Sequence, residues 1–404
     1  MAQDDHKLRR ALRGVALRLA IAQIIAWAGT LYIFPALLPA WEAAFDWSKA
    51  QISGAFTLAL LLSAFAAPVA GRLIDKGFGR ALFLGGYLLA GLALFALSVV
   101  QTLWQFYAVW ALLGLTMAGT LYEACFAVIT RYFGVYAQRA ITIVTLVAGF
   151  AGSVSFPAAQ FITRFSNWRV AVVTFAVAVL CVALPLAWLG SSQAIRHSGG
   201  VHPPPSRHAG QNVGQALGSP TFWLLGLAFL CIALEHGLLL THLLPLLYEY
   251  GLSPDGAVLA AAMIGPMQVF GRLLMVAVES RLDAAKIAAL SFGFMALAAL
   301  ALLGVSGMPF LIVLFVVLHG SGYGVTSVTR PVVTAEFLGR ENFGAISGMM
   351  ATLFMTAFAA APTIAAFVWE LGGYDLVVAT ALAIALSGLL LFSVATRLHG
   401  RVVR

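Results

Sequence analysis

Residues 71–80 read Gly-Arg-Leu-Ile-Asp-Lys-Gly-Phe-Gly-Arg, a run of charges and glycines between two long apolar stretches. The flanking stretches, 48–71 and 81–100, contain almost no charged side chains. Each approaches the roughly 20 apolar residues that an α-helix needs to cross a bilayer. The pattern therefore predicts two membrane-spanning helices joined by a charged turn.

The same alternation of apolar stretches and short polar breaks covers the whole chain. Of the 404 residues, 62% are hydrophobic and 9% are charged, whereas soluble domains carry about 25% charged residues. This composition excludes a set of water-soluble domains, and it excludes a disordered chain, which would be polar and charged. Outer-membrane barrels show weak alternating patterns of about ten residues, so we predict an all-α integral membrane protein.

Twelve segments share this length and apolar character. They are 15–41, 48–71, 81–100, 104–130, 140–163, 168–190, 220–248, 255–278, 284–306, 308–335, 342–370 and 374–396. The longest interruption contains three consecutive prolines with glycines and serines, a composition typical of a flexible linker. We therefore predict an N-terminal six-helix bundle over 1–190, a linker over 191–219 and a C-terminal six-helix bundle over 220–404.

The positive side chains predict how the chain is oriented in the membrane. If the N-terminus is cytoplasmic, 20 of the 23 Lys and Arg residues fall on the cytoplasmic side, and the exceptions are Lys49, Arg164 and Arg169. Cytoplasmic loops are enriched in these residues, so we expect both termini and the linker to face the cytoplasm from the cell's inner membrane. The net charge of +8 then reflects topology rather than nucleic-acid binding.

The run at 71–80 resembles the loop 2–3 signature of the major facilitator superfamily. That signature is a glycine, any residue, a leucine, one further residue, an aspartate, a basic residue, a glycine and another basic residue. Its first glycine permits close helix approach, and its aspartate can accept hydrogen bonds from a helix N-terminus or pair with a basic residue. The resemblance implies two pseudo-symmetric six-helix bundles that alternate access to a substrate held between them. It also implies conformational-gating roles for Gly71, Asp75, Lys76, Gly79, Arg80 and Arg139.

Within that superfamily, the chain is most similar to the monocarboxylate-transporter and oxalate/formate-antiporter branch. The resemblance rests on 47–52, on 132–140, and on 242–245 followed by Arg272. In that branch an arginine in helix 8 is associated with the substrate carboxylate, and Arg272 is the matching position. Two departures are Gln268, where the branch commonly has an aspartate, and a first helix without lysine.

Ionisable side chains inside membrane spans are costly and indicate function by default. Arg272 has Gln268 one turn earlier on the same face, and its guanidinium can bind a carboxylate through two hydrogen bonds. The alternative is a structural arginine that binds backbone carbonyls or Glu279. We predict a substrate site of Arg272 and Gln268 with three further side chains, although single aromatic residues in spans more often pack in the core. These three are Tyr32, Tyr122 and His319.

Proton coupling needs a carboxylate or imidazole that titrates inside the protein. Glu123 and Arg272 are expected at similar depth, so we predict that they face a common cavity and pair when no substrate is bound; the alternative is a structural pair. Glu235 and His236 are neighbours near the middle of a span, and we predict a proton-coupling role although only one can face the cavity squarely. The glycine-rich run around His319 allows either local unwinding or close helix packing.

The leading prediction is a secondary transporter that carries a small organic anion, such as a monocarboxylate, together with a proton. The sequence has no phosphate-binding loop for ATP, no cysteine pair with metal-ligand spacing and no catalytic cluster. We expect no enzyme activity, no cofactor, and a monomer whose partners are its small-molecule substrate, protons and lipid. The alternative is a proton-driven exporter or importer of a larger amphipathic or aromatic molecule.

Overall fold

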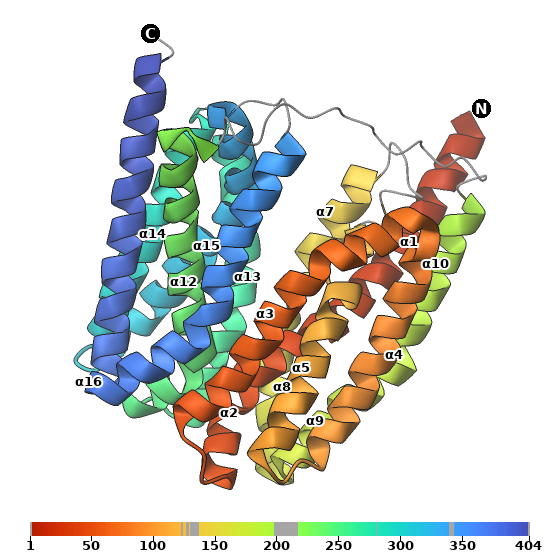
Figure 1. Cartoon of the computed structure of the whole chain (residues 1–404), viewed down its shortest axis with the longest axis horizontal. Helices are drawn as coiled ribbons and strands as arrows, with labels where there is room; N and C mark the ends of the chain where they lie inside the picture. The colour runs from red at the N-terminus through yellow and green to blue at the C-terminus, as the bar shows by residue number, and fades with distance from the viewer. Residues whose placement is uncertain are drawn as a thin grey trace. The chain divides into compact units, whose positions relative to one another are not determined.

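The computed structural model describes residues 2–122, 124–126, 129, 137–197, 217–279, 281–338 and 343–402. Within these ranges the regular structure is helical, and no β-strand occurs. Eleven helical stretches of the described chain are long and apolar enough to span a membrane. The predicted all-α membrane fold is thereby confirmed. The chain divides into two compact units, Met1–Ser206 and Arg207–Arg404 (Figure 1).

The first unit is built from helices that pair into longer spans. Their bounds are α1 Ala2–Trp27, α2 Ile33–Ala44, α3 Lys49–Leu73, α4 Gly79–Ser98, α5 Leu103–Thr120, α7 Ala137–Ala148, α8 Ala151–Phe165, α9 Trp168–Ala178 and α10 Leu184–His197. Single π-helical turns at Ala28–Tyr32, Ile74–Phe78 and Val179–Ala183 connect neighbouring helices. Helices α1 with α2, α7 with α8, and α9 with α10 each form one candidate span.

One end of the first unit is filled by aromatic side chains. Phe34 stacks on Phe56 with ring centroids 4.3 Å apart, and Trp110 meets both rings edge-on. Trp41 and Phe106 extend the cluster, and all five side chains are buried. Such pairs contribute about 0.5–1.5 kcal/mol each beyond the area that they bury. The cluster therefore ties α2, α3 and α5 together.

Glycines allow helices of the first unit to touch backbone to backbone. A β-carbon at Gly114 of α5 would lie 2.1 Å from the carbonyl oxygen of Ala59 in α3. Gly86 of α4 packs in the same way against Gly119 and Thr120 at the end of α5, and Figure 1 shows these three helices side by side. Small residues at helix contacts are characteristic of membrane bundles, because lipid tails remove the hydrophobic driving force for helix association.

The second unit is built from longer helices. Their bounds are α12 Pro220–Glu249, α13 Pro254–Val278, α14 Ala284–Leu303, α15 Leu311–Leu338 and α16 Phe343–Val402. Helix α16 is broken at Gly372 and Gly373, and Gly373 has a φ of +68°, in the left-handed region that favours glycine. One of the eleven candidate spans, Gly348–His399, contains both arms of α16. Counting the arms separately gives twelve spans, the number that the sequence predicted.

Helices α13 and α15 also meet backbone to backbone. A β-carbon at Gly324 would lie 2.3 Å from the carbonyl oxygen of Gln268, and one at Gly271 would lie 2.4 Å from that of Ser321. Helix α15 runs unbroken over Leu311–Leu338. Its glycine-rich run therefore serves close packing and not local unwinding, which were the two alternatives that the sequence left open.

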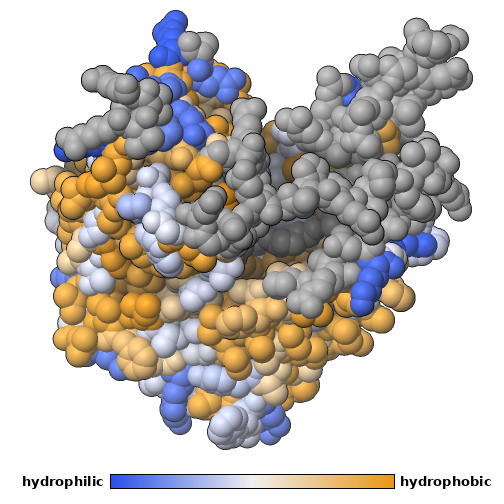
Figure 2. Space-filling view, turned by 45° about the horizontal axis from the view of Figure 1, so that its top comes forward, coloured by the Kyte–Doolittle hydropathy of each residue, from blue (hydrophilic) through white to orange (hydrophobic). Residues whose placement is uncertain are grey.

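Large apolar side chains lie on the outer surface of the helices. Figure 2 shows hydrophobic residues over broad areas of the visible face, with the most hydrophilic residues toward its margins. Exposed examples are Phe65, Trp104, Leu297, Phe310 and Leu390. So much exposed apolar area is unfavourable in water and is expected where a protein meets lipid.

Candidate functional site

Three ionisable side chains meet inside the second unit. Glu235 and His236 are consecutive residues of α12, and His319 lies on α15. The Nδ1 atom of His319 is 3.5 Å from Oε1 of Glu235, and its Nε2 atom is 2.9 Å from Nδ1 of His236. All three residues are buried, with at most 2% of their surface exposed. His319 therefore stands between a carboxyl group and a second imidazole.

The carboxyl group of Glu235 is fully enclosed, and neither of its oxygens has a hydrogen-bond partner among the residues that the structure describes. An isolated buried carboxylate is strongly unfavourable, whereas a neutral carboxylic acid or a carboxylate beside an imidazolium is tolerated. The 3.5 Å approach to His319 permits either form. In both forms the pair carries no net charge.

The ring of His236 lies among aromatic neighbours. Tyr323 stacks on it with ring centroids 3.4 Å apart, and Phe358 of α16 lies at 6.1 Å. Its 2.9 Å contact with His319 is a hydrogen bond in which one imidazole donates and the other accepts. Although Glu235 and His236 were expected to point in different directions, they reach the two opposite nitrogens of one ring. No group of three His, Cys, Asp or Glu in the described part of the chain could hold a metal ion.

Arg272 and Gln268 lie where α13 contacts α15. The Nε atom of Arg272 donates a hydrogen bond of 3.2 Å to the backbone carbonyl of Gly324. The Arg272 side chain is half-buried, and Gln268 is buried. This bond to a carbonyl is the contact that the structural alternative for Arg272 required. It also orients the plane of the guanidinium.

Tyr32 ends a π-helical turn, Ala28–Tyr32, that was not predicted from the sequence. Ser155 of α8 donates a hydrogen bond of 2.9 Å to the carbonyl oxygen of Ala28, which stabilises the turn. The ring of Tyr32 packs edge-on against Phe156, with 6.3 Å between ring centroids. Turns of this kind are frequent at functional sites. The local signal for this one is the Gly-Thr pair at 29–30, since both residues weaken an α-helix.

Tyr122 belongs to a second aromatic group in the first unit. Its ring is 4.7 Å from that of Trp27 and stacks on Phe126 at 5.0 Å. The indole N–H of Trp27, which was not singled out from the sequence, is buried and has no acceptor among the residues that are described. Glu123, which we predicted to carry a proton and to pair with Arg272, lies outside the described residues.

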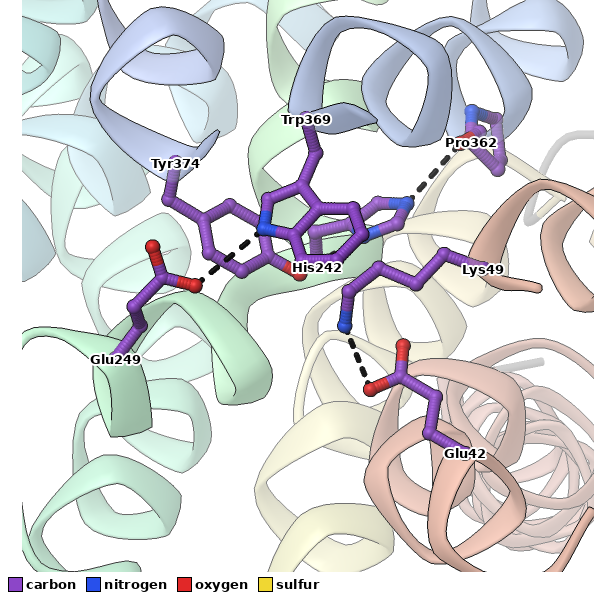
Figure 3. A network of polar contacts seen from close by, with 7 residues as sticks. All are labelled: Glu42, Lys49, His242, Glu249, Pro362, Trp369 and Tyr374. Atoms are coloured by element: carbon purple, nitrogen blue, oxygen red, sulfur yellow. Dashed lines mark hydrogen bonds and ion pairs between the residues drawn. The ribbon is translucent and has the colours of Figure 1, made fainter. Parts of the chain in front are cut away.

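His242 joins α12 to both arms of α16, as Figure 3 shows. Its Nε2 atom donates a hydrogen bond of 3.0 Å to the carbonyl of Pro362, because a carbonyl can only accept. Its Nδ1 atom then accepts a hydrogen bond of 3.2 Å from the hydroxyl of Tyr374. Both nitrogens of this buried imidazole are therefore satisfied, which indicates a structural role.

The same close-up shows two polar contacts near helix ends. In the second unit, the indole N–H of Trp369 donates to Glu249 with a distance of 3.3 Å. In the first unit, Lys49 at the start of α3 forms an ion pair of 2.7 Å with Glu42 of α2. Each contact ties together two helices of its own unit. Neither was expected to take part in substrate binding, and neither touches the buried trio of Glu235, His236 and His319.

The comparison with known protein families decides the identity of the fold. Residues 19–362 match the Major Facilitator Superfamily. The chain belongs to the major facilitator superfamily. It is therefore a multi-pass membrane protein that acts as a transporter of small molecules, and it is not an enzyme.

Solved structures of other superfamily transporters resemble this one. A bacterial homolog of the human lysosomal transporter Spinster, in an inward-facing and unoccupied conformation, has a TM-score of 0.67 and 15% identity over 96% of each chain. A mutant of the nucleoside transporter NupG has a TM-score of 0.72 and 13% identity over 94% of this chain and 99% of that chain. At these identities the likeness concerns the fold alone. No curated protein sequence matches the chain.

The superfamily signature at 71–80 forms the turn between α3 and α4. A π-helical turn covers Ile74–Phe78, and Gly77 within it has a φ of +97°, in the left-handed region that favours glycine. Gly79, which was predicted to act in gating, begins α4 and packs against Ile74. The turn itself depends on Gly77, which was quoted in the signature but not selected as a gating residue.

Two other predicted gating residues have described side chains. Lys76 is exposed, and Arg80 donates a hydrogen bond of 2.6 Å to Ser192 of α10. This bond links the signature turn to α10, the last described helix of the first unit. The side chains of the remaining gating positions lie outside the described part of the structure, and their roles stay predictions. They are Gly71, Asp75 and Arg139.

Proposed function

We propose that this transporter carries a small organic anion together with a proton, and that a monocarboxylate is the first substrate to test. The observation that supports the proposal most strongly is the buried trio of Glu235, His236 and His319. A transporter driven by a proton gradient needs an enclosed group that binds and releases a proton, and ionisable residues inside spans are the usual carriers. Glu235 fits this requirement, because it is buried and its carboxyl oxygens have no hydrogen-bond partner within the described ranges.

Arg272 supports the anionic character of the substrate. Its bond to Gly324 orients the guanidinium, and an oriented guanidinium binds a carboxylate through two parallel charge-assisted hydrogen bonds. The half-buried setting strengthens this attraction, because the effective dielectric constant is lower than in water. Gln268, one turn earlier on α13, adds an amide that can donate to a second acceptor on the substrate.

The second candidate function is the export or import of a larger amphipathic or aromatic molecule against protons. The observation that favours it is the aromatic group of Trp27, Tyr122 and Phe126 in the first unit. The buried indole N–H of Trp27 has no acceptor in the described chain, and a substrate oxygen would satisfy it. Tyr32, five residues after Trp27, is a further aromatic side chain of the first unit, and its ring packs on Phe156 of α8.

Uptake of labelled monocarboxylates into proteoliposomes under an imposed pH gradient tests the leading proposal. We expect accumulation that follows the gradient and stops when a protonophore dissipates it. Arg272→Ala should reduce uptake about 10- to 100-fold, which corresponds to one or two charge-assisted hydrogen bonds. Arg272→Lys is the matched control, because lysine keeps the positive charge but lacks the planar guanidinium that binds a carboxylate through two hydrogen bonds. This variant should retain an intermediate rate.

Two outcomes would contradict this assignment. Uptake that is independent of the pH gradient would contradict the proposed proton coupling. Unchanged anion uptake by Arg272→Ala would contradict the proposed role of Arg272. Transport of aromatic amphiphiles but not of carboxylates would favour the second candidate.

The orientation in the membrane is part of the proposal. The distribution of Lys and Arg supports cytoplasmic termini and a cytoplasmic linker, in a monomer within the cell's inner membrane. Reporter enzymes that fold on only one side of the membrane, fused after residue 404 and within 191–219, should both report the cytoplasm. A reporter that is active outside at either place would reverse the topology.

A further inference from the structure

We propose that Glu235, His319 and His236 form a single proton relay, in which His319 passes a proton between the carboxyl group and the second imidazole. The relay rests on the proton coupling proposed above, and it assigns His319 to the proton pathway instead of the predicted substrate site. The geometry behind it is one juxtaposition: His319 presents Nδ1 to Glu235 at 3.5 Å and Nε2 to His236 at 2.9 Å.

The hydrogen bond between the imidazoles defines a starting state. When Nε2–H of His319 donates to Nδ1 of His236, the Nδ1 atom of His319 carries a lone pair that faces Glu235. The protonated carboxyl group of Glu235 gives its proton to this lone pair, while the Nε2 proton of His319 passes to His236. One O–H and one N–H bond break, and two N–H bonds form. The products are the Glu235 carboxylate, neutral His319 and the His236 imidazolium.

The relay keeps the same net charge at every step. The three side chains have a net charge of zero before the transfer, as a carboxylic acid and two neutral imidazoles. They also have a net charge of zero after it, as a carboxylate, a neutral imidazole and an imidazolium. This matters because burying a net charge is the main cost inside a membrane. The ring face of Tyr323, 3.4 Å from His236, stabilises the imidazolium at the end of the row. Among the described contacts of Glu235, His236 and His319, Tyr323 is the one further titratable group. The other aromatic rings in contact with the two histidines, Phe315 and Phe358, are apolar.

The gap between Glu235 and His319 provides the switch. A separation of 3.5 Å is longer than a good hydrogen bond, so transfer from Glu235 requires the two groups to approach by about 0.5 Å, to a normal N···O distance. Glu235 lies on α12 and His319 on α15. A small shift of one helix along the other therefore opens or closes the relay, which links proton transfer to the conformation of the second unit.

A purely structural polar cluster would pair its buried donors and acceptors. Here three buried atoms have no hydrogen-bond partner in the described part of the chain, namely both carboxyl oxygens of Glu235 and Nδ1 of His319. His242 is equally buried, yet Tyr374 and Pro362 satisfy both of its nitrogens. His242, on the same helix α12 as Glu235 and His236, therefore has the contacts of a structural histidine, whereas the trio does not. This contrast makes His242 the matched control.

Infrared difference spectroscopy of the purified full-length protein in lipid, followed through a pH titration without substrate, tests the relay directly. We expect a C=O band from a buried carboxylic acid that disappears in Glu235→Gln. In His319→Asn the pH midpoint of this band should rise by about one unit or more, a tenfold change in proton affinity, because no imidazolium stabilises the carboxylate. His242→Asn should leave the midpoint unchanged.

The relay is overturned if the band persists in Glu235→Gln, or if His319→Asn titrates like the wild type. Should Glu235→Gln fail to fold, Glu235→Asp replaces it. The shorter acid should move the band and its midpoint, and an unmoved band would equally contradict the assignment of the proton to this residue.

Transport of labelled lactate separates a proton role of His319 from a substrate role. Glu235→Gln and His319→Asn should lower gradient-driven accumulation about tenfold or more, yet keep lactate exchange at equal pH on both sides, since exchange moves no net proton. A raised KM for exchange in His319→Asn would return this residue to the substrate site. If the wild type does not carry lactate, the proposed substrate class fails, while the infrared titration still decides the relay.

Discussion

Gly324 sets how closely α13 and α15 approach, and replacing it tests the packing and the Arg272 contact together. In Gly324→Ala the new β-carbon would lie 2.3 Å from the carbonyl oxygen of Gln268, 2.7 Å from its Cα and 2.8 Å from its carbonyl carbon. These are backbone atoms, so no side-chain rotation can relieve the overlap. The two helices must therefore separate locally.

The magnitude follows from these distances. Ordinary van der Waals contact of a β-carbon begins at 3.4 Å, so the helices must move apart by about 1 Å. Such a shift carries the Gly324 carbonyl, now 3.2 Å from Nε of Arg272, beyond hydrogen-bonding distance. Overpacking costs about 1–3 kcal/mol and the lost bond about 0.5–1.5 kcal/mol. The higher helix propensity of alanine offsets about 0.5–1 kcal/mol, so we expect a net loss of about 0.5–4 kcal/mol.

Thermal unfolding in detergent, followed by tryptophan fluorescence, measures this loss. The matched control is Gly293→Ala in α14, where a β-carbon meets nothing within 4 Å. We expect the control to unfold at or above the wild-type temperature and Gly324→Ala to unfold below it, with reduced anion uptake through the displaced Arg272. If Gly324→Ala were as stable as Gly293→Ala, the close contact between α13 and α15 would be refuted.

Three further predictions concern a turn, a helix cap and the acid dependence that the cap produces. Gly77→Ala places a β-carbon at a φ of +97° and should destabilise the protein by about 1–2 kcal/mol, whereas Gly85→Ala, which meets nothing within 4 Å, should not lower the unfolding temperature. Asp283 caps α14, so Asp283→Ala should cost about 1 kcal/mol. Hydrogen bonds from Lys286 lower the pKa of Asp283. This stabilisation is present above the ordinary pKa of an aspartate and is lost as the pH falls through the lowered value. The unfolding temperature of the wild type should therefore fall more steeply with decreasing pH than that of Asp283→Asn. If the two unfolding temperatures fell in parallel, the stabilisation by the Asp283 carboxylate would be excluded.

The spans were predictable because their length and apolar composition are local properties. Helix α12 covers Pro220–Glu249 where 220–248 was expected, and the break at Gly373 falls at a predicted turn. The π-helical turn at Ala28–Tyr32 was not predictable in this way. Ser155, which stabilises it, lies 127 residues from the carbonyl that it binds.

The candidate site was predictable as a set of residues but not as an arrangement. Glu235, His236 and His319 stand out in the sequence because they are ionisable groups in apolar spans. Their pairing joins residues 83 positions apart, and no local pattern indicates it. Arg272 illustrates the same limit, since its bond to the carbonyl of Gly324 joins residues 52 positions apart.

The sequence by itself determined that this protein crosses the membrane in twelve helices, because each span needs only a sufficient run of apolar residues and a turn at either end. It also determined which few ionisable groups enter the membrane. Only the tertiary structure decided that His319 stands between Glu235 and His236 and that Arg272 reaches Gly324. The physical reason is that glycine contacts between helices set their depth and rotation, and these decide which polar groups face each other.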